Sequence, residues 1–254
     1  VLNLGTTARQ LDVLVGGDLR QSPGAVITET GQASPSLRMT GTLPAVADCK
    51  GVLTNNVTVG FDNTAGIRLE SDLTISHILR LQRGSIYTIG YTLILEQGAL
   101  LESADDSYVD GKIFKKGLTD GDFLFPVGKN GFVRWVRLRE ATGNFSVEFI
   151  RADPKLIAVD LGEGLSHISS LEHWQIASET PSAKAKVELS FHDVNSGGVT
   201  ALDQLRVAYL VNNVWQDGGN ITSTGSAGSA GSVTGNLVEI FSPGLPTFFT
   251  LASS

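Results

Sequence analysis

Apolar and polar residues alternate in short runs along the chain. In 145–149 and 184–191 every second residue is apolar, which places the apolar side chains on one face of an extended strand. No window carries apolar residues at helical spacing over three turns. The best segment, 156–168, is interrupted by Gly162 and Gly164 and is predicted to be a loop with at most one helical turn. The pattern therefore predicts an all-β fold.

The first hundred residues repeat a unit made of an alternating strand, polar residues, a glycine and a second short strand. Segments 78–87 and 92–101 show it most clearly, with Gly84 and Gly98 lying 14 positions apart. One such unit cannot pair its own backbone or bury its own apolar face, whereas stacked copies do both. We therefore predict an irregular parallel β-solenoid over 1–107, with glycines at its corners. An antiparallel sandwich with similar hairpins is the alternative.

The pattern changes at Ser107. From there the strands become longer and carry ten of the 11 phenylalanines and all three tryptophans. Asn- and Gly-rich turns recur between them, as expected for half-buried antiparallel strands. We predict a second domain over 108–254, an antiparallel β-sandwich or jelly roll. Its Gly/Ser-rich segment 223–236 is predicted to be a flexible hairpin loop.

Charge and composition narrow the classes of function. The formal net charge of −7 and the scattered basic residues disfavour nucleic-acid binding, and Lys115-Lys116 is the only adjacent basic pair. No apolar run approaches the ~18 residues of a membrane-spanning helix, so no membrane span is expected. The single cysteine, Cys49, cannot form an internal disulfide and is expected to be buried. The ends at Val1 and Ser254 look like cuts, which predicts a processed portion of a longer precursor.

Several short motifs lie in the part of the chain that begins at Ser107. They are SYVDGKI at 107–113, FPVG at 125–128, EHWQI at 172–176, LRVAY at 205–209, Trp215, and FSP to LAS at 241–253. Together they resemble a module of large surface proteins of Bacteroidetes, of the gliding-motility and adhesin type exported by the type IX secretion system. The resemblance covers nearly the whole chain, because β-solenoid-like repeats usually precede the module. A sorting domain normally follows in that family, and this sequence stops before one.

The candidate chemistry is sparse. The four histidines show no paired metal-ligand spacing, and for His173 packing or a backbone hydrogen bond is the expected role. No nucleophile elbow and no phosphate-binding glycine motif occurs. We therefore expect no enzymatic activity and no organic cofactor.

Acidic residues give the strongest metal candidates, namely Asp105, Asp106, Asp120 and Asp122. Oxygen-rich turns of this kind suit Ca²⁺. A carboxylate pair also suits acid–base cleavage of a glycan. The third interpretation is that aspartates of this type simply form turns.

Tryptophans are candidates for stacking on sugar rings. Trp135, Trp174 and Trp215 all lie in predicted strands of alternating pattern, which favours core packing. Trp215, beside the turn at 212–213, is the residue for which a ligand-binding role is retained.

The leading functional hypothesis is a secreted structural or adhesive protein of the cell surface. It would serve as a module of a large adhesin or as the subunit of an extracellular fibre. Its expected partners are copies of itself or neighbouring surface-protein modules, joined through sheet edges. A carbohydrate-binding module and, behind it, a glycan-cleaving enzyme on a solenoid are the alternatives.

Overall fold

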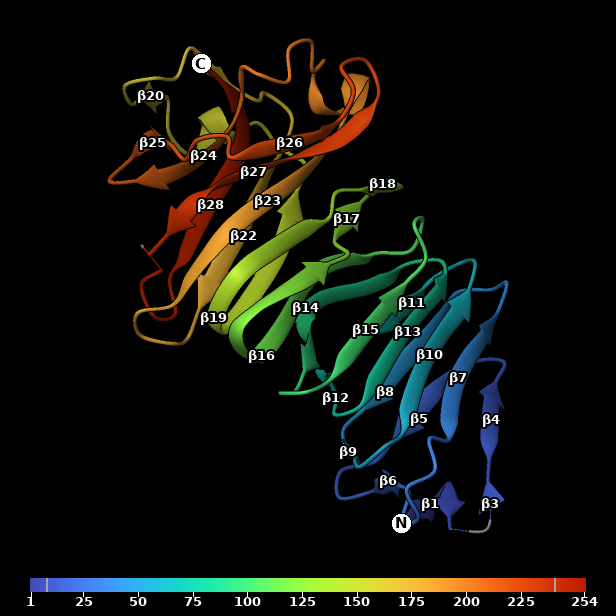
Figure 1. Cartoon of the computed structure of the whole chain (residues 1–254). Coiled ribbons are helices and arrows are strands. Elements are labelled where there is room, and N and C mark those ends of the chain that lie inside the picture. Colours follow the sequence, from blue (N-terminus) through green and yellow to red (C-terminus); the bar gives the residue numbers. More distant parts are fainter. Residues whose placement is uncertain (8, 240) are drawn as a thin grey trace. The chain divides into compact units, whose positions relative to one another are not determined.

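The all-β fold is confirmed (Figure 1). The computed structural model describes residues 1–7, 9–239 and 241–254, with the side chains of 193 and 194 left out. It divides into two compact units, Val1–Gly117 and Leu118–Ser254. In the described residues the only helical segments are the 3₁₀ turns Pro154–Leu156 and Asp193–Ser196.

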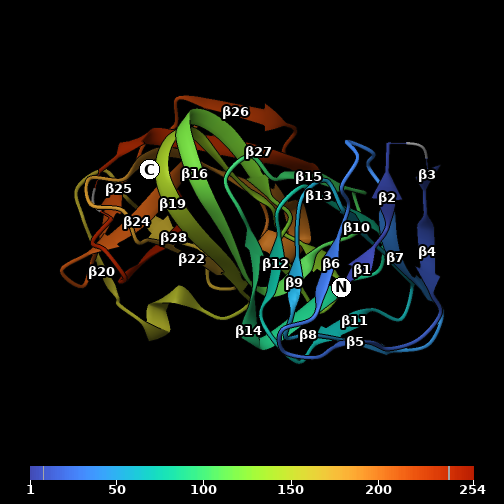
Figure 2. The ribbon, with the colours of Figure 1, turned by 90° about the horizontal axis from the view of Figure 1, so that it is seen from below.

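The first unit is a parallel β-solenoid, as predicted, and its strands form three faces (Figure 2). One face contains β4 (Asp12–Val15), β7 (Ser36–Gly41), β10 (Thr58–Asn63), β13 (Ile78–Arg83) and β15 (Leu100–Ser103). The second contains β5 (Leu19–Gln21), β8 (Ala45–Cys49), β11 (Ile67–Leu69), β14 (Ile86–Leu95) and the start of β16 (Val109–Phe125), while β12 (Leu73–Ile75) also pairs with β14. The third contains β1 (Leu2–Asn3), β6 (Val26–Thr28) and β9 (Val52–Leu53), and an antiparallel pair, β2 (Gly5–Thr6) and β3 (Arg9–Gln10), precedes β4.

The register gives the true repeat of the solenoid. Asp12 lies opposite Ser36, Ser36 opposite Thr58, Thr58 opposite Ile78, and Ile78 opposite Leu100. These pairs set a coil length of 20 to 24 residues. The 14-residue spacing in the sequence is therefore not the coil period. It joins β13 to β14, which are successive faces of the same coil.

Stacked rows of apolar side chains fill the solenoid. Leu37, Val59 and Leu79 occupy one such row, since each is opposite the next across β7, β10 and β13 and all are buried. Gly84 turns the corner between β13 and β14 with a φ of +76°, and a Cβ there would collide with the backbone oxygen of Asn63. The glycine corner predicted from the sequence is therefore required by space as well as by φ.

The second unit is built from two arms of one mixed sheet, which meet at strand β19 (Val136–Ile150). The end of β19 pairs with β22, and its beginning pairs with β23. Glu140, with a φ of +49°, lies at the register shift between these stretches. The first arm continues through β22 (His173–Ser178), β28 (Pro246–Ser253), β24 (Leu205–Val211), β25 (Val214–Asp217) and β20 (Asp160–Leu161), with β21 (His167–Ile168) beside β28. Its neighbouring strands are antiparallel except β20, which pairs in parallel with β25. The second arm contains β23 (Lys184–His192), β27 (Ala230–Val238) and β26 (Thr222–Gly225), and β17 (Gly128–Lys129) and β18 (Phe132–Val133) form a separate hairpin.

Aromatic side chains dominate the core of the second unit. Phe149 packs on Trp174 with ring centroids 5.4 Å apart, and Phe145 meets Phe241 edge to face at 5.2 Å. The indole N–H of Trp174 donates to the backbone oxygen of Arg134 at 2.8 Å. A buried indole needs such an acceptor, since an unpaired N–H in a core costs free energy.

Two local predictions need correction. The Gly/Ser-rich segment 223–236 is mostly strand, not loop: β26 and β27 pair across it, and β27 also pairs with β23. Val233 and Ser232 are consequently buried. The segment 156–168 does begin in a helical turn, Pro154–Leu156, but it also contributes the short strands β20 and β21.

Candidate binding surfaces

The first coil of the solenoid leaves all three faces with a terminal strand. β1, β4 and β5 each stand at the end of their strand order. Apolar side chains of this coil lie on the surface, with Leu2, Leu11 and Leu14 exposed to 49%, 55% and 59%. A sheet edge with exposed apolar residues is a template for another strand.

Charged residues near this edge are engaged with the following coil. The Asp12 carboxylate accepts hydrogen bonds from the Ser36 hydroxyl at 2.7 Å and the Ser36 backbone N–H at 3.1 Å. The hydroxyl bond is the main cause of the lowered pKa of Asp12. Asp18 likewise accepts the backbone N–H of Val46 at 2.9 Å. These carboxylates tie the first coil to the second, and β4 (sequence DVLV) contains neither lysine nor proline to block addition of a strand.

The candidate carboxylates lie in two different places. Asp105 and Asp106 are exposed on the turn before β16, in the first unit. Asp120 and Asp122 lie within the part of β16 that belongs to the second unit, and Asp122 accepts hydrogen bonds from Arg139 at 3.0 Å and from the Glu140 N–H at 3.2 Å. Asp120 and Asp122 therefore belong to a strand, which corrects the expectation of a turn.

The described residues offer no preformed cluster of metal ligands. Among the described residues, no three His, Cys, Asp or Glu side chains are grouped closely enough to hold an ion. Arg139 also forms an ion pair with Asp122, so the negative charge of that carboxylate is already balanced by the guanidinium.

The tryptophans differ from one another. Trp215 is fully buried and donates its indole N–H to Ala158 O at 3.0 Å. A ring without exposed surface cannot stack on a sugar, so the structure contradicts Trp215 as a ligand-binding residue. Trp174 is buried as well. Trp135 lies between strands rather than in one and is half-buried, with the Arg137 guanidinium 5.5 Å from its ring centre.

A buried ion pair joins Arg134, the residue after β18, to Glu172, the residue before β22. Arg134 Nε donates to Glu172 at 2.9 Å, and both side chains are nearly inaccessible. Burial raises the pKa of Glu172, and the attraction of Arg134 opposes this shift. Next to it, His173 bonds the backbone oxygen of Ala152 at 3.1 Å and packs on Phe248, which confirms the structural role expected for this histidine. Burial lowers its pKa.

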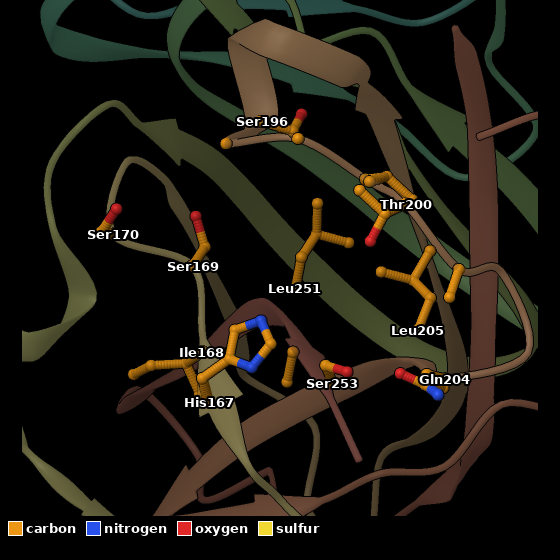
Figure 3. Close-up of a pocket in the computed structure, with 15 residues that line it drawn as sticks. His167, Ile168, Ser169, Ser170, Ser196, Thr200, Gln204, Leu205, Leu251 and Ser253 are labelled. Atoms are coloured by element: carbon orange, nitrogen blue, oxygen red, sulfur yellow. The ribbon is translucent and has the colours of Figure 1, made fainter. Parts of the chain in front are cut away.

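A hollow of about 200 Å³ opens over the end of β28 in the second unit. Figure 3 shows Leu251 near its middle, His167 and Ser253 together on one side, and Ser196 and Thr200 on the opposite side. The lining comes from four stretches in three distant parts of the sequence. These stretches are His167–Ser170, Ser196–Ala201, Gln204–Leu205 and Leu251–Ser253, from β21, β24, β28 and the loops beside them. No motif joins these residues, so the sequence gives no signal for the hollow.

Other observations concern the chain as a whole. Cys49 is buried as expected. Within the part of the chain that the structure describes, no helix has the length and apolar character that crossing a membrane requires.

Comparison with known proteins gives no relative for this chain. No protein-family model, no curated protein and no solved structure matches it. The resemblance to type IX-secreted surface proteins therefore stays a prediction from the quoted residues.

Proposed function

We propose that this chain is a non-enzymatic structural or adhesive module of the cell surface that joins other chains through the first coil of its solenoid. The observation that supports this most is the terminal position of β1, β4 and β5 with exposed Leu2, Leu11 and Leu14 beside them. Parallel strands add to such an edge without any change in the existing coils, because each coil contacts only its neighbours.

The opposite edge of one face suggests how a second copy would add. β15 ends the strand order that β4 begins, and its first residue, Leu100, is exposed. In the register of the solenoid, β4 of a second copy placed next to β15 would set its Val13 beside Leu101. Both residues are half-buried in the row that includes Leu79. A neighbouring solenoid module with the same coil length would fit the free β4 edge in the same manner.

The cell-surface location follows from the resemblance in sequence. The acidic net charge of −7 agrees with a protein that stays apart from nucleic acid and remains in solution until it assembles. Antibody labelling of intact cells tests this part of the proposal, and signal only after cell lysis would contradict it.

Sedimentation velocity over a range of concentrations tests whether copies of the chain associate through the first coil. Electron microscopy of the largest species would show whether they form fibres. We expect the parent chain to associate and a Leu11→Lys, Leu14→Lys double variant to remain monomeric, because charge on an edge strand blocks strand addition. Leu156→Lys is the matched control, since Leu156 is exposed to 83% in the second unit. A parent chain that is monomeric throughout would refute the proposal, as would an equal loss of association in the control.

A further inference from the structure

The hollow over β28 is lined without formal charge. Its lining residues include no aspartate, glutamate, lysine or arginine, and His167 is their one titratable side chain. An ionic ligand placed there would lose hydration without gaining an ion-pair partner. The lining therefore favours a neutral ligand.

Polar groups at the rim are available for hydrogen bonds. Ser170, Thr200 and Gln204 are exposed, and their side chains form no hydrogen bond with other described residues. His167 uses Nδ1 toward the Ser166 hydroxyl at 3.1 Å, which leaves Nε2 as the ring atom for a ligand. These groups combine donors and acceptors, so they suit hydroxyl groups, which both donate and accept.

The floor of the hollow is apolar. Leu251, Leu205 and Val199 line the hollow and are buried, and Figure 3 places Leu251 near its middle. An apolar floor with a few convergent polar groups is the usual composition of a small-molecule site. A volume of about 200 Å³ lies below the ~300–1,000 Å³ of sites for drug-sized ligands, so the ligand is smaller, on the scale of one ring.

We propose that this hollow binds a single neutral sugar ring, as a free monosaccharide or as the end of a glycan. The C–H face of the ring would rest on Leu251 and Leu205. Its hydroxyl groups would meet Thr200, Gln204 and the His167 imidazole. This site is independent of the solenoid edge, since all of its residues belong to the second unit. It replaces Trp215 as the glycan-binding candidate, and it needs no aromatic stacking.

Protein-observed NMR on the full chain tests the site. The probes are a panel of neutral hexoses and N-acetylhexosamines, with glucuronate as the charged counterpart, at millimolar concentration. A few hydrogen bonds and one small apolar contact correspond to a Kd on the order of 1 mM. We expect concentration-dependent shifts in the His167 imidazole signals and in the backbone amides of Ser170 and Gln204 with at least one neutral sugar.

Three substitutions test whether ligand binding depends on the hollow. Thr200→Trp would fill the hollow from its exposed rim and should weaken binding at least about tenfold, whereas Thr222→Trp, at an exposed position of β26 outside the lining, should leave it unchanged. Gln204→Ala gives a second, smaller change that keeps the hollow open. Absence of shifts with every neutral sugar would overturn the proposal. Tighter binding of glucuronate, or equal binding by Thr200→Trp, would do the same.

Discussion

The two units bury their side chains by different means. In the solenoid, aliphatic residues such as Leu37, Val59 and Leu79 stack on equivalents in neighbouring coils, and charged residues form ion pairs on the outside. In the second unit, aromatic rings interlock and the ion pair Arg134–Glu172 is itself buried. A stacked array of coils has no intrinsic end, so the first coil of the solenoid leaves β1, β4 and β5 as terminal strands.

Breaking the buried ion pair should give the largest effect. Arg134→Met leaves Glu172 without its cation, and we expect the free energy of unfolding of the second unit to fall by about 3–5 kcal/mol. Urea denaturation measures it. Arg20→Met is the matched control in the first unit, because the Arg20 ion pairs are exposed and should contribute at most about 1 kcal/mol.

Removing both charges of the buried pair should be less harmful than removing one. A double variant, Arg134→Met with Glu172→Leu, removes both charges and should recover part of the lost stability. An effect of Arg134→Met no larger than that of Arg20→Met would show that the buried pair contributes no more than a surface pair.

The stacked rows of the solenoid predict a local response. Leu79→Ala should lower stability by about 2–5 kcal/mol, because it leaves a cavity in a fully buried row. Each coil contacts only its neighbours, so amide hydrogen exchange should accelerate in β10, β13 and β15 more than in β4 and β5. Uniform acceleration over all five strands would instead indicate that the solenoid unfolds as one cooperative body.

Alkaline pH should act on the first unit through Cys49. Burial is the main cause that raises the pKa of this thiol to about 11, against about 8.5 in an unfolded chain. The contribution of the neutral thiol to stability is therefore complete below about pH 8.5 and is lost as the pH rises through the folded value, by roughly 3 kcal/mol in all. We expect Cys49→Ala to show a shallower decline of the free energy of unfolding between about pH 8 and 11. Parallel pH profiles for the two proteins would contradict the assignment to Cys49.

Acidic pH should act on the second unit through His173, with a smaller effect. Burial lowers the pKa of this imidazole, and the hydrogen bond to Ala152 partly offsets that shift. The folded state prefers the neutral ring, so its contribution is complete above about pH 6.5 and is lost as the pH falls through the lowered folded pKa. We expect His173→Phe to retain more of its stability than the parent chain between about pH 7 and 5. Unfolding followed by tryptophan fluorescence provides the comparison, and a steeper acid loss in the variant would refute it.

Much of the fold could be predicted from local pattern. Period-two alternation in 145–149 and 184–191 identified strands that the structure contains as parts of β19 and β23. The glycines of the first hundred residues correctly indicated solenoid corners such as Gly84. The Gly/Ser-rich segment 223–236 was predicted wrongly as a loop because its burial depends on β23, a strand about 40 residues earlier in the chain.

The candidate sites could be predicted from the sequence less well than the fold, because they depend on tertiary structure. Sequence alone determined the all-β class, the change of pattern near Ser107 and the burial of Cys49, because alternation, glycine spacing and composition are local properties. Only the folded chain decided that Trp215 is enclosed, that coils repeat every 20 to 24 residues, and that residues from β21, β24 and β28 enclose one hollow. Register and enclosure arise from pairing between segments far apart in the sequence, and one strand does not encode the identity of its neighbour.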